Sequence, residues 1–248
     1  AGRFITPFMN KNISPTEVQY LFDTDNIALI LNDPAINDTY DFWMELHVFG
    51  VPYAANTQVV GCSGRNDVFE GTLKLISTVE TYTHVNQLLS PIVTYSEMNN
   101  YQAGATDIIG QTVRSFNITL NSTVSNAKLY VTTSNHGANS GGEEYNRRQH
   151  FIYFDNQLIS SYTPGGISCE PFRVYNTQSN GIYGNGPKPL SYWTSFNNWC
   201  PGDKIPIRVF DLGNLTSGSH SFKIEVPTAV FANQQGYFPI SVYVQGDL

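Results

Sequence analysis

The chain has 248 residues, of which 13% are charged, and its 13 Lys and Arg against 20 Asp and Glu give a formal net charge of -7. This length allows one large or two modest domains with a buried core. The acidic balance excludes nucleic acid and anionic membranes as main partners, because both bind basic surfaces. No uninterrupted apolar stretch of about 18 residues and no basic-then-apolar leader occur, so we expect a processed chain that is secreted or periplasmic.

Apolar and polar residues alternate with a period of two along most of the chain, a pattern that predicts half-buried antiparallel strands. In chain order, the predicted strands lie at residues 18–22, 42–50, 71–77, 114–120, 128–134, 204–212, 220–227 and 239–246. Residues 150–162 predict a hairpin that turns at Asp155 to Gln157, and residues 213–219 predict a loop. Residues 24–33 allow at most a short helix, since no segment sustains a helical period.

The density of predicted strands, with loops of Gly, Pro, Asn and Ser, predicts an all-β fold of sandwich or jelly-roll architecture. We place a domain boundary near residues 80–90, which gives an N-terminal domain of residues 1–85 and a C-terminal domain of residues 86–248. The C-terminal domain is long enough for a complete sandwich of about eight strands. The N-terminal domain offers only about four or five strands, so we expect another segment to cover its sheet edges and open face.

Cys169 and Cys200 both lie in Gly- and Pro-rich loop sequence, where a bridge between them would stabilise the fold by roughly 3 to 4 kcal/mol in the chain-entropy estimate. Cys62 would then have no partner within this chain. It is either a buried free thiol or the partner of a cysteine on another stretch of sequence.

The histidines show no metal-binding spacing. They form neither a His-x-His nor an HExxH pair, no CxxC occurs, and their positions are His47, His84, His136, His150 and His220. We therefore predict no metal site. A GxSxG nucleophile elbow is absent, and a dinucleotide site would need a βαβ unit that this strand pattern lacks. Carboxylates remain as the candidate catalytic groups.

Two segments place carboxylates beside other polar or aromatic groups. In "FWMELHVFG", residues 42–50, alternation puts Glu45 and His47 on the face opposite the apolar one, either as a ligand surface or as a solvated face. In "GGEEYNRRQH", residues 141–150, two acids and two arginines follow two glycines on a loop before a strand. An acid beside an arginine can hold a water or a substrate carbonyl, but a solvated loop with paired charges has the same composition.

Three blocks of sequence resemble, in their order and spacing, the peptide:N-glycosidase F family. They are "GRFITPF" at 2–8, "GGEEYNRRQH" at 141–150 and "NNWCPGDKIPIRV" at 197–209. The resemblance implies two tandem antiparallel jelly rolls, the first of them incomplete in this chain. It also implies a secreted amidase that hydrolyses the bond between asparagine and N-acetylglucosamine in N-linked glycoproteins or glycopeptides, at a site between the domains and without a cofactor.

The resemblance also assigns roles to single residues by their position in these blocks. It implies catalytic roles for Glu144, Glu45 and Arg148. It implies substrate-binding roles for His47, His136, Tyr145 and Trp199, and a disulfide between Cys169 and Cys200. For Glu143 and Arg147, which have no role in these assignments, we predict outward-facing, solvated side chains on the loop.

The chain departs from the family pattern in ways that bear on activity. Gly142 and Asn146 stand where the family pattern has the two cysteines on either side of its glutamate. His47 stands in place of a tryptophan, and Phe196 in place of an arginine. The family's essential aspartate belongs to sequence upstream of the "GRFITPF" block, so a companion N-terminal chain or fragment is an expected partner. The alternative is a non-catalytic double jelly roll of the same family that binds glycan or protein.

Overall fold

The computed structural model describes residues 2–10, 12–48, 63, 69–77, 86–102, 111–178 and 181–248. The question of a partner for Cys62 lies outside these residues, as does the end of the predicted strand at 42–50.

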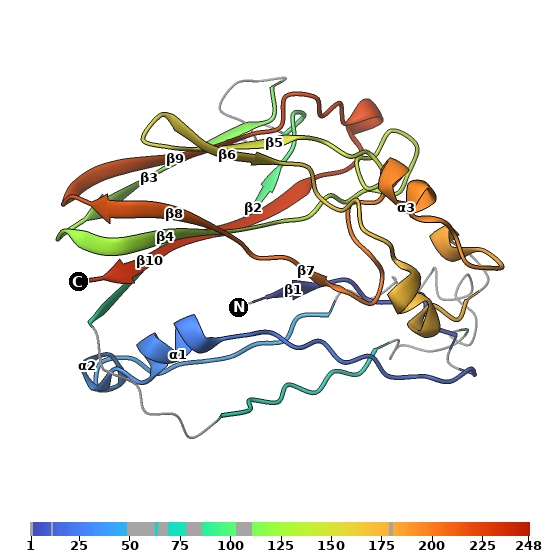
Figure 1. Cartoon of the computed structure of the whole chain (residues 1–248), viewed down its shortest axis with the longest axis horizontal. Coiled ribbons are helices and arrows are strands. Elements are labelled where there is room, and N and C mark those ends of the chain that lie inside the picture. The colour runs from blue at the N-terminus through green and yellow to red at the C-terminus, as the bar shows by residue number, and fades with distance from the viewer. Residues whose placement is uncertain are drawn as a thin grey trace.

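Two antiparallel sheets of four strands each face one another and form the body of the structure (Figure 1). The first sheet has the order β2-β10-β4-β8, with β2 at Gln87–Met98, β10 at Phe238–Asp247, β4 at Val124–Thr133 and β8 at Arg208–Leu215. The second has the order β3-β9-β5-β6, with β3 at Val113–Leu120, β9 at Gly218–Glu225, β5 at His150–Phe154 and β6 at Gln157–Tyr162. Except in the β5–β6 hairpin, consecutive strands of this body belong to opposite sheets, which is the winding of a jelly roll. The predicted all-β fold class is confirmed.

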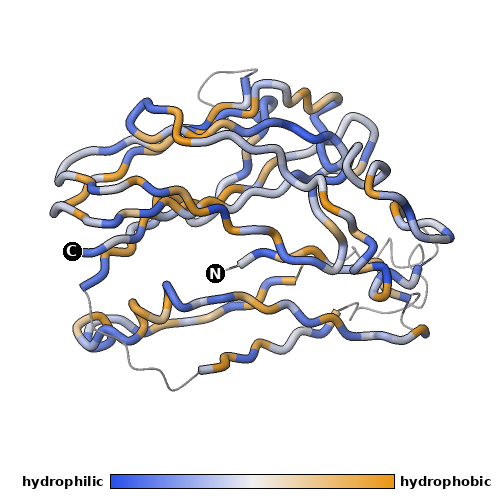
Figure 2. The backbone as a smooth tube through the Cα atoms, in the orientation of Figure 1, coloured by the Kyte–Doolittle hydropathy of each residue, from blue (hydrophilic) through white to orange (hydrophobic). Residues whose placement is uncertain are grey.

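Side chains that alternate along the facing strands fill the space between the sheets. Leu129 and Val131 on β4 are fully buried, as are Phe222 and Ile224 on β9. Each such side chain stabilises the fold by about 1.5 to 3 kcal/mol when it leaves water. Tyr130, between the two buried residues of β4, is only partly buried and lies on the outer face. Hydrophobic and hydrophilic residues accordingly alternate along the strands (Figure 2).

The predicted hairpin is confirmed, and the predicted loop at 213–219 is partly wrong. The hairpin turns at Asp155 and Asn156, whose φ angles of 48° and 64° suit the tight turn between β5 and β6. In contrast, β8 continues through Gly213 to Leu215, and β9 begins at Gly218. Gly213 has a φ of 66° and lies where the pairing of β8 with β4 is irregular. The glycine that suggested a loop in the sequence therefore belongs to a bulge within β8.

A long connection between β6 and β8 packs against one end of the sandwich and has a small core of its own. It contains 3-10 helices at Glu170–Tyr175 and Gly181–Tyr183, the α-helix α3 at Leu190–Phe196 and the strand β7 at Lys204–Ile205. The disulfide between Cys169 and Cys200 is present and packs with the buried rings of Tyr183 and Trp193. These helices are too short to show a period in the sequence, which is why this stretch reads as a loop.

The N-terminal segment forms a layer against the outer face of the β2-β10-β4-β8 sheet (Figure 1). Its strand β1 at Arg3–Phe4 pairs with β7, and its helices are α1 at Asp25–Leu31 and α2 at Pro34–Asn37. Asn26 on α1 donates through Nδ2 to the hydroxyl of Tyr243 on β10 at 2.8 Å. Because α1 lies within residues 24–33, the short helix expected there is confirmed.

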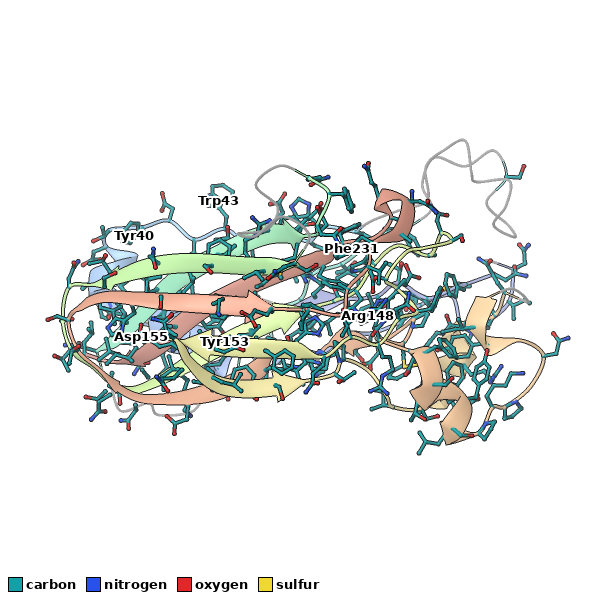
Figure 3. All side chains as sticks on the ribbon, turned by 90° about the horizontal axis from the view of Figure 1, so that it is seen from above. Tyr40, Trp43, Arg148, Tyr153, Asp155 and Phe231 are labelled. Carbon is teal, nitrogen blue, oxygen red and sulfur yellow. A yellow bond between two sulfur atoms is a disulfide. The ribbon has the colours of Figure 1, made fainter. Side chains whose placement is uncertain are left out.

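The strands predicted at 18–22, 42–50 and 71–77 are not formed in the described part of these segments. Leu46 lies close to Gly71, so the second and third segments touch, yet no backbone hydrogen bond joins them among the described residues. A strand needs a hydrogen-bonded neighbour as well as an alternating pattern. The side chains stay open to solvent, and Trp43 is 93% exposed and points away from the body (Figure 3).

Candidate functional site

The candidate site lies at the end of the sandwich where the loop after β4 meets the segment before β10. The backbones of His136 and Tyr237 exchange hydrogen bonds, with N to O distances of 3.0 and 3.2 Å. The chain then turns back, so that the Glu144 amide donates to the Gly137 carbonyl at 3.3 Å. The Gly137 amide in turn donates to Oε2 of Glu144 at 3.2 Å. These bonds bring the candidate carboxylate beside the first residues of its own loop.

Two glycines permit this close turn. A Cβ at Gly142 would lie 1.8 Å from the carbonyl oxygen of Gly137. Gly137 has a φ of 106°, and a Cβ there would lie 2.4 Å from the Cα of Gly236. Only residues without a side chain fit such contacts. Gly142 is thus required by the path of this loop.

Glu144 and Tyr145 lie side by side on the partly exposed part of the loop. Burial raises the pKa of Glu144, and the nearby Tyr145 hydroxyl and the Gly137 amide oppose that rise. Burial and the neighbouring Glu144 raise the pKa of Tyr145, so its hydroxyl keeps its proton. The Tyr145 ring meets Phe196 edge to face, with centroids 5.9 Å apart. The loop therefore places a carboxyl group and a protonated phenol side by side, and the phenol ring packs against Phe196.

His136, Trp199 and Tyr237 form a second group of aromatic rings. The His136 ring stacks on Tyr237 with centroids 5.4 Å apart, and the Trp199 centroid lies 6.0 Å away. Nε2 of His136 is 2.8 Å from the hydroxyl of Ser134. Burial, with a smaller effect of Arg3, lowers the pKa of His136 to about 4, so the imidazole is neutral at neutral pH. It is an aromatic, hydrogen-bonding surface there and not a cation.

Arg3 borders the candidate site, although the sequence pattern did not single it out. Its guanidinium donates to the Ser134 hydroxyl at 3.3 Å, to the Pro239 carbonyl at 3.0 Å and to the Ser241 hydroxyl at 3.3 Å. It also lies 5.9 Å from the ring centroid of Tyr95. Its only signal in the sequence is its place in the "GRFITPF" block. Through Arg3 the N-terminal segment reaches the surroundings of His136.

The expectation that Glu143 and Arg147 are outward and solvated is wrong. Glu143 is fully buried, and its carboxylate accepts from Arg148 at 2.6 and 3.1 Å and from the amides of Val230 and Phe231 at 2.8 and 3.1 Å. Arg147 is half-buried and donates to the carbonyls of Pro164 and Thr194 at 3.1 and 2.8 Å. The loop bends at these residues, so the alternation of a strand does not predict which side chains face inward.

The structure brings four of the predicted site residues to this loop and its neighbours, namely Glu144, Tyr145, His136 and Trp199. Arg148 is held in the ion pair with Glu143. Glu45 and His47 lie elsewhere. Their side chains are 76% and 81% exposed, and they contact each other at 2.8 Å. No contact within the described ranges joins either of them to Glu144.

The residues that the structure describes contain no cluster of three or more His, Cys, Asp or Glu side chains arranged to hold a metal ion. No helix in the described ranges is both long and apolar enough to pass through a bilayer.

Comparison with known proteins identifies a family for most of the C-terminal part of the chain. Residues 104–245 match the family described as "Peptide-N-glycosidase F, C terminal". A structure of PNGF-II shares 25% identity over 54% of this chain and 24% of that chain, with a TM-score of 0.45. Recombinant peptide:N-glycanase F shares 21% identity over 65% of this chain and 52% of that chain, with a TM-score of 0.47.

A structure of PNGase F, described as a glycosylasparaginase from Flavobacterium meningosepticum, also shares 21% identity with this chain. The match covers 65% of this chain and 52% of that chain, with a TM-score of 0.46. The chain thus covers only part of the length of each of these proteins, and a search of curated proteins found no match. Since the family match spans more than half of the sequence, the chain belongs to the peptide-N-glycosidase F family, whose C-terminal part its residues 104–245 represent.

Proposed function

We propose that this chain forms part of a secreted or periplasmic peptide:N-glycosidase, an amidase that hydrolyses the asparagine–N-acetylglucosamine bond of N-linked glycoproteins and glycopeptides. The observation that carries the proposal is the position of Glu144, whose carboxylate accepts from the Gly137 amide directly after His136, in the group of aromatic rings of His136, Trp199 and Tyr237. A half-buried carboxyl with a raised pKa next to aromatic surfaces is a combination that binding and catalytic sites use.

The proposed reaction adds water across an amide. The water oxygen bonds to the amide carbon, the carbon–nitrogen bond breaks, and the leaving nitrogen takes up a proton. Glu144 hydrogen-bonds the sugar or the attacking water, and the Tyr145 hydroxyl donates beside it. The neutral His136 and the indole of Trp199 offer surfaces for the apolar faces of the sugar. The family's aspartate, which activates the water or protonates the leaving nitrogen, comes from a companion segment.

The companion segment has a matching surface in this chain. Residues 40–48 and 69–77 show alternating apolar side chains and no backbone hydrogen bonds to one another among the described residues. Their exposed large apolar side chains are Tyr40, Phe42, Trp43, Met44, Phe69, Leu73, Leu75 and Ile76. An alternating strand added beside these segments would supply backbone hydrogen-bond partners and apolar neighbours for them. Formation of that sheet is also what would fix Glu45 and His47 relative to the rest.

The test is glycan release from a denatured N-glycoprotein by the chain together with its companion segment, read by mass spectrometry. We expect free glycan and conversion of asparagine to aspartate, with both lost in Glu144→Gln. Glu17→Gln, which changes an exposed carboxylate far along the chain from the blocks at 141–150 and 197–209, serves as the control. Absence of release, where a known amidase acts on the same substrate, would rule the proposal out.

A non-catalytic glycan-binding module is the second candidate. The observation that favours it is the exposed Glu45–His47 pair, in which the acid is already bound to a residue that replaces the family's tryptophan. In that case glycan arrays show binding without turnover, and Glu144→Gln leaves the binding unchanged.

A further inference from the structure

The backbone that carries Glu144 is held by a buried ion pair one residue away. The side chain of Glu143 is 0% exposed, and both of its oxygens are used by the donors described above. Nε and Nη2 of Arg148 are committed to the two oxygens of this carboxylate. A buried charge requires such compensation, and a bidentate arginine with two amides provides it. We call these four donors and the Glu143 carboxylate the Glu143 clamp.

The Glu143 clamp ties the Glu144 loop to the segment that leads into Tyr237. Val230 and Phe231 supply the amides, and Phe231 has a φ of 47°, a left-handed conformation that a phenylalanine adopts only where its surroundings impose it. The side chain of Phe231 is 3% exposed in the main core. The clamp therefore anchors the loop on a rigid part of the jelly roll.

A second anchor comes from the residue before Trp199. Nδ2 of Asn198 donates to the carbonyls of Glu143 at 3.3 Å and Asn146 at 3.2 Å, and also to the carbonyl of Glu144. The three segments that carry Glu144, Trp199 and Tyr237 are thus joined behind the site by polar contacts of Glu143 and Asn198. Their relative positions depend on these contacts.

The family resemblance places two cysteines at positions 142 and 146, where this chain has Gly142 and Asn146. Nδ2 of Asn146 donates instead to the carbonyl of Gly142 at 2.7 Å, and the Asn146 amide donates to the Glu143 carbonyl at 3.2 Å. A cysteine at 142 has no room, because its Cβ would meet the Gly137 carbonyl. Hydrogen bonds and one ion pair hold this loop.

We propose that Glu143 is a positioning residue that orients Glu144, and that Arg148 serves as its counter-charge and does not touch the substrate. This rests on the proposed amidase site but makes a separate claim about how the site is built. It predicts that loss of the clamp changes the geometry of the Glu144 loop while the jelly roll stays folded, and that Glu143 and Arg148 act as one unit.

Hydrogen exchange of single amides in the full chain tests the geometry without any substrate. Glu143→Gln keeps one acceptor oxygen but loses the charge and the oxygen that accepts from Nε of Arg148. It should therefore weaken the clamp and speed exchange at Val230 and Phe231, and also at Gly137 and Glu144, which bond to each other. The strand amides of β9 should be unchanged. A role in stability alone would leave Gly137 and Glu144 protected, and that result would overturn the proposal.

The ion pair of Glu170 and Arg173 provides a matched control. It is also bidentate, with distances of 2.6 and 2.8 Å, and the Lys188 amide donates to the same carboxylate at 2.7 Å. Glu170→Gln should speed exchange at Lys188 and leave Gly137 and Glu144 unaffected. Equal effects of the two variants at Gly137 would contradict a specific role of Glu143.

A double-mutant cycle tests the pairing in the active complex with its companion segment. Glu143→Gln should lower kcat by about tenfold to a hundredfold with little change in KM, as misplacement of a catalytic group does. Arg148→Lys, which keeps the charge and covers the case that Glu143→Gln does not fold, should lower kcat to a smaller extent. The double variant should lose no more of its kcat than Glu143→Gln does.

If the losses in kcat of the two single variants multiply in the double variant, or if KM rises in Arg148→Lys alone, Arg148 contacts the substrate and the proposal is wrong. If the wild type releases no glycan, the amidase proposal fails, and hydrogen exchange still decides the role of Glu143.

Discussion

His136 and Tyr237 are joined twice, by reciprocal backbone hydrogen bonds and by stacked rings whose planes differ by 22°. One residue follows β4 and the other precedes β10, so the contact fixes where the loop of Glu144 begins. Arg3 reaches the same place from the N-terminal segment through Ser134. The candidate site is therefore assembled from the connections at one end of the jelly roll, and from the segment that packs on its outer face.

The Tyr237 ring should contribute directly to glycan binding. We expect Tyr237→Ala to weaken the affinity for an N-glycopeptide about tenfold, because an aromatic contact of about 1 to 1.5 kcal/mol is lost. Tyr237→Phe keeps the ring and should bind within about twofold of the wild type. Isothermal titration calorimetry measures both. Unchanged affinity in Tyr237→Ala would place the glycan elsewhere.

Gly142 should tolerate no side chain. Gly142→Ala places a methyl group into the Gly137 carbonyl, and we expect a loss of about 1 to 3 kcal/mol in the free energy of unfolding together with loss of the Glu144 loop geometry. Gly186 has open space around it, so Gly186→Ala should be neutral. Chemical denaturation of the two variants gives the comparison. Equal stability of both would show that the loop has a different path.

The disulfide should stabilise the connection that carries Trp199. Its sequence separation of 31 residues corresponds to about 3 to 4 kcal/mol in the chain-entropy estimate. We expect Cys169→Ser/Cys200→Ser to unfold at a lower temperature, with the far-ultraviolet circular dichroism of the sandwich retained at low temperature. A melting temperature that reductant does not change in the wild type would contradict this contribution.

His220 should make stability depend on pH in a direction set by its partners. Nδ1 is 2.7 Å from the carboxylate of Asp155, and Nε2 is 2.8 Å from the carbonyl of Thr216, so both nitrogens face acceptors. Burial lowers the pKa of His220, but the bonds to Asp155 and Thr216 outweigh it and the net shift is upward. The resulting stabilisation is fully present below the ordinary value of about 6.5 and is lost as pH rises through the raised pKa.

The variant Asp155→Asn isolates this effect, because its amide oxygen still accepts from the Ser221 amide while the charge is gone. The difference in unfolding free energy between the wild type and Asp155→Asn should be larger at about pH 5.5 than at about pH 8.5. His136 and His150, whose pKa values burial lowers to about 4, affect both proteins alike. A difference that grows with pH would contradict the arrangement.

The jelly-roll strands were predictable from the sequence because each has one face in a continuous core. The alternation in residues 114–120 and 239–246 corresponds to β3 and β10, and the turn at Asp155 follows from residues that accept a positive φ. The pattern at 42–48 is equally regular but forms no strand, since alternation cannot supply the neighbouring backbone that a sheet requires.

The site was only partly predictable for a related reason. The resemblance singled out the loop of residues 141–150 as a candidate, but side-chain direction in a tight turn depends on contacts with distant segments. Glu143 faces inward because the amides of Val230 and Phe231 lie there, more than eighty residues along the chain. Arg3 bonds Ser134 across a separation of 131 residues. No local pattern contains such information.

The most direct test of the amidase proposal is hydrolysis of a defined N-glycopeptide in water enriched in heavy oxygen, by the chain together with its companion segment. The proposal predicts a free intact glycan and an aspartate that carries one heavy oxygen in its new carboxyl group, with neither product from Glu144→Gln. Release with an unlabelled peptide asparagine would mean that the glycosidic bond is cut instead, and binding without any release would mean that the chain is a glycan-binding module.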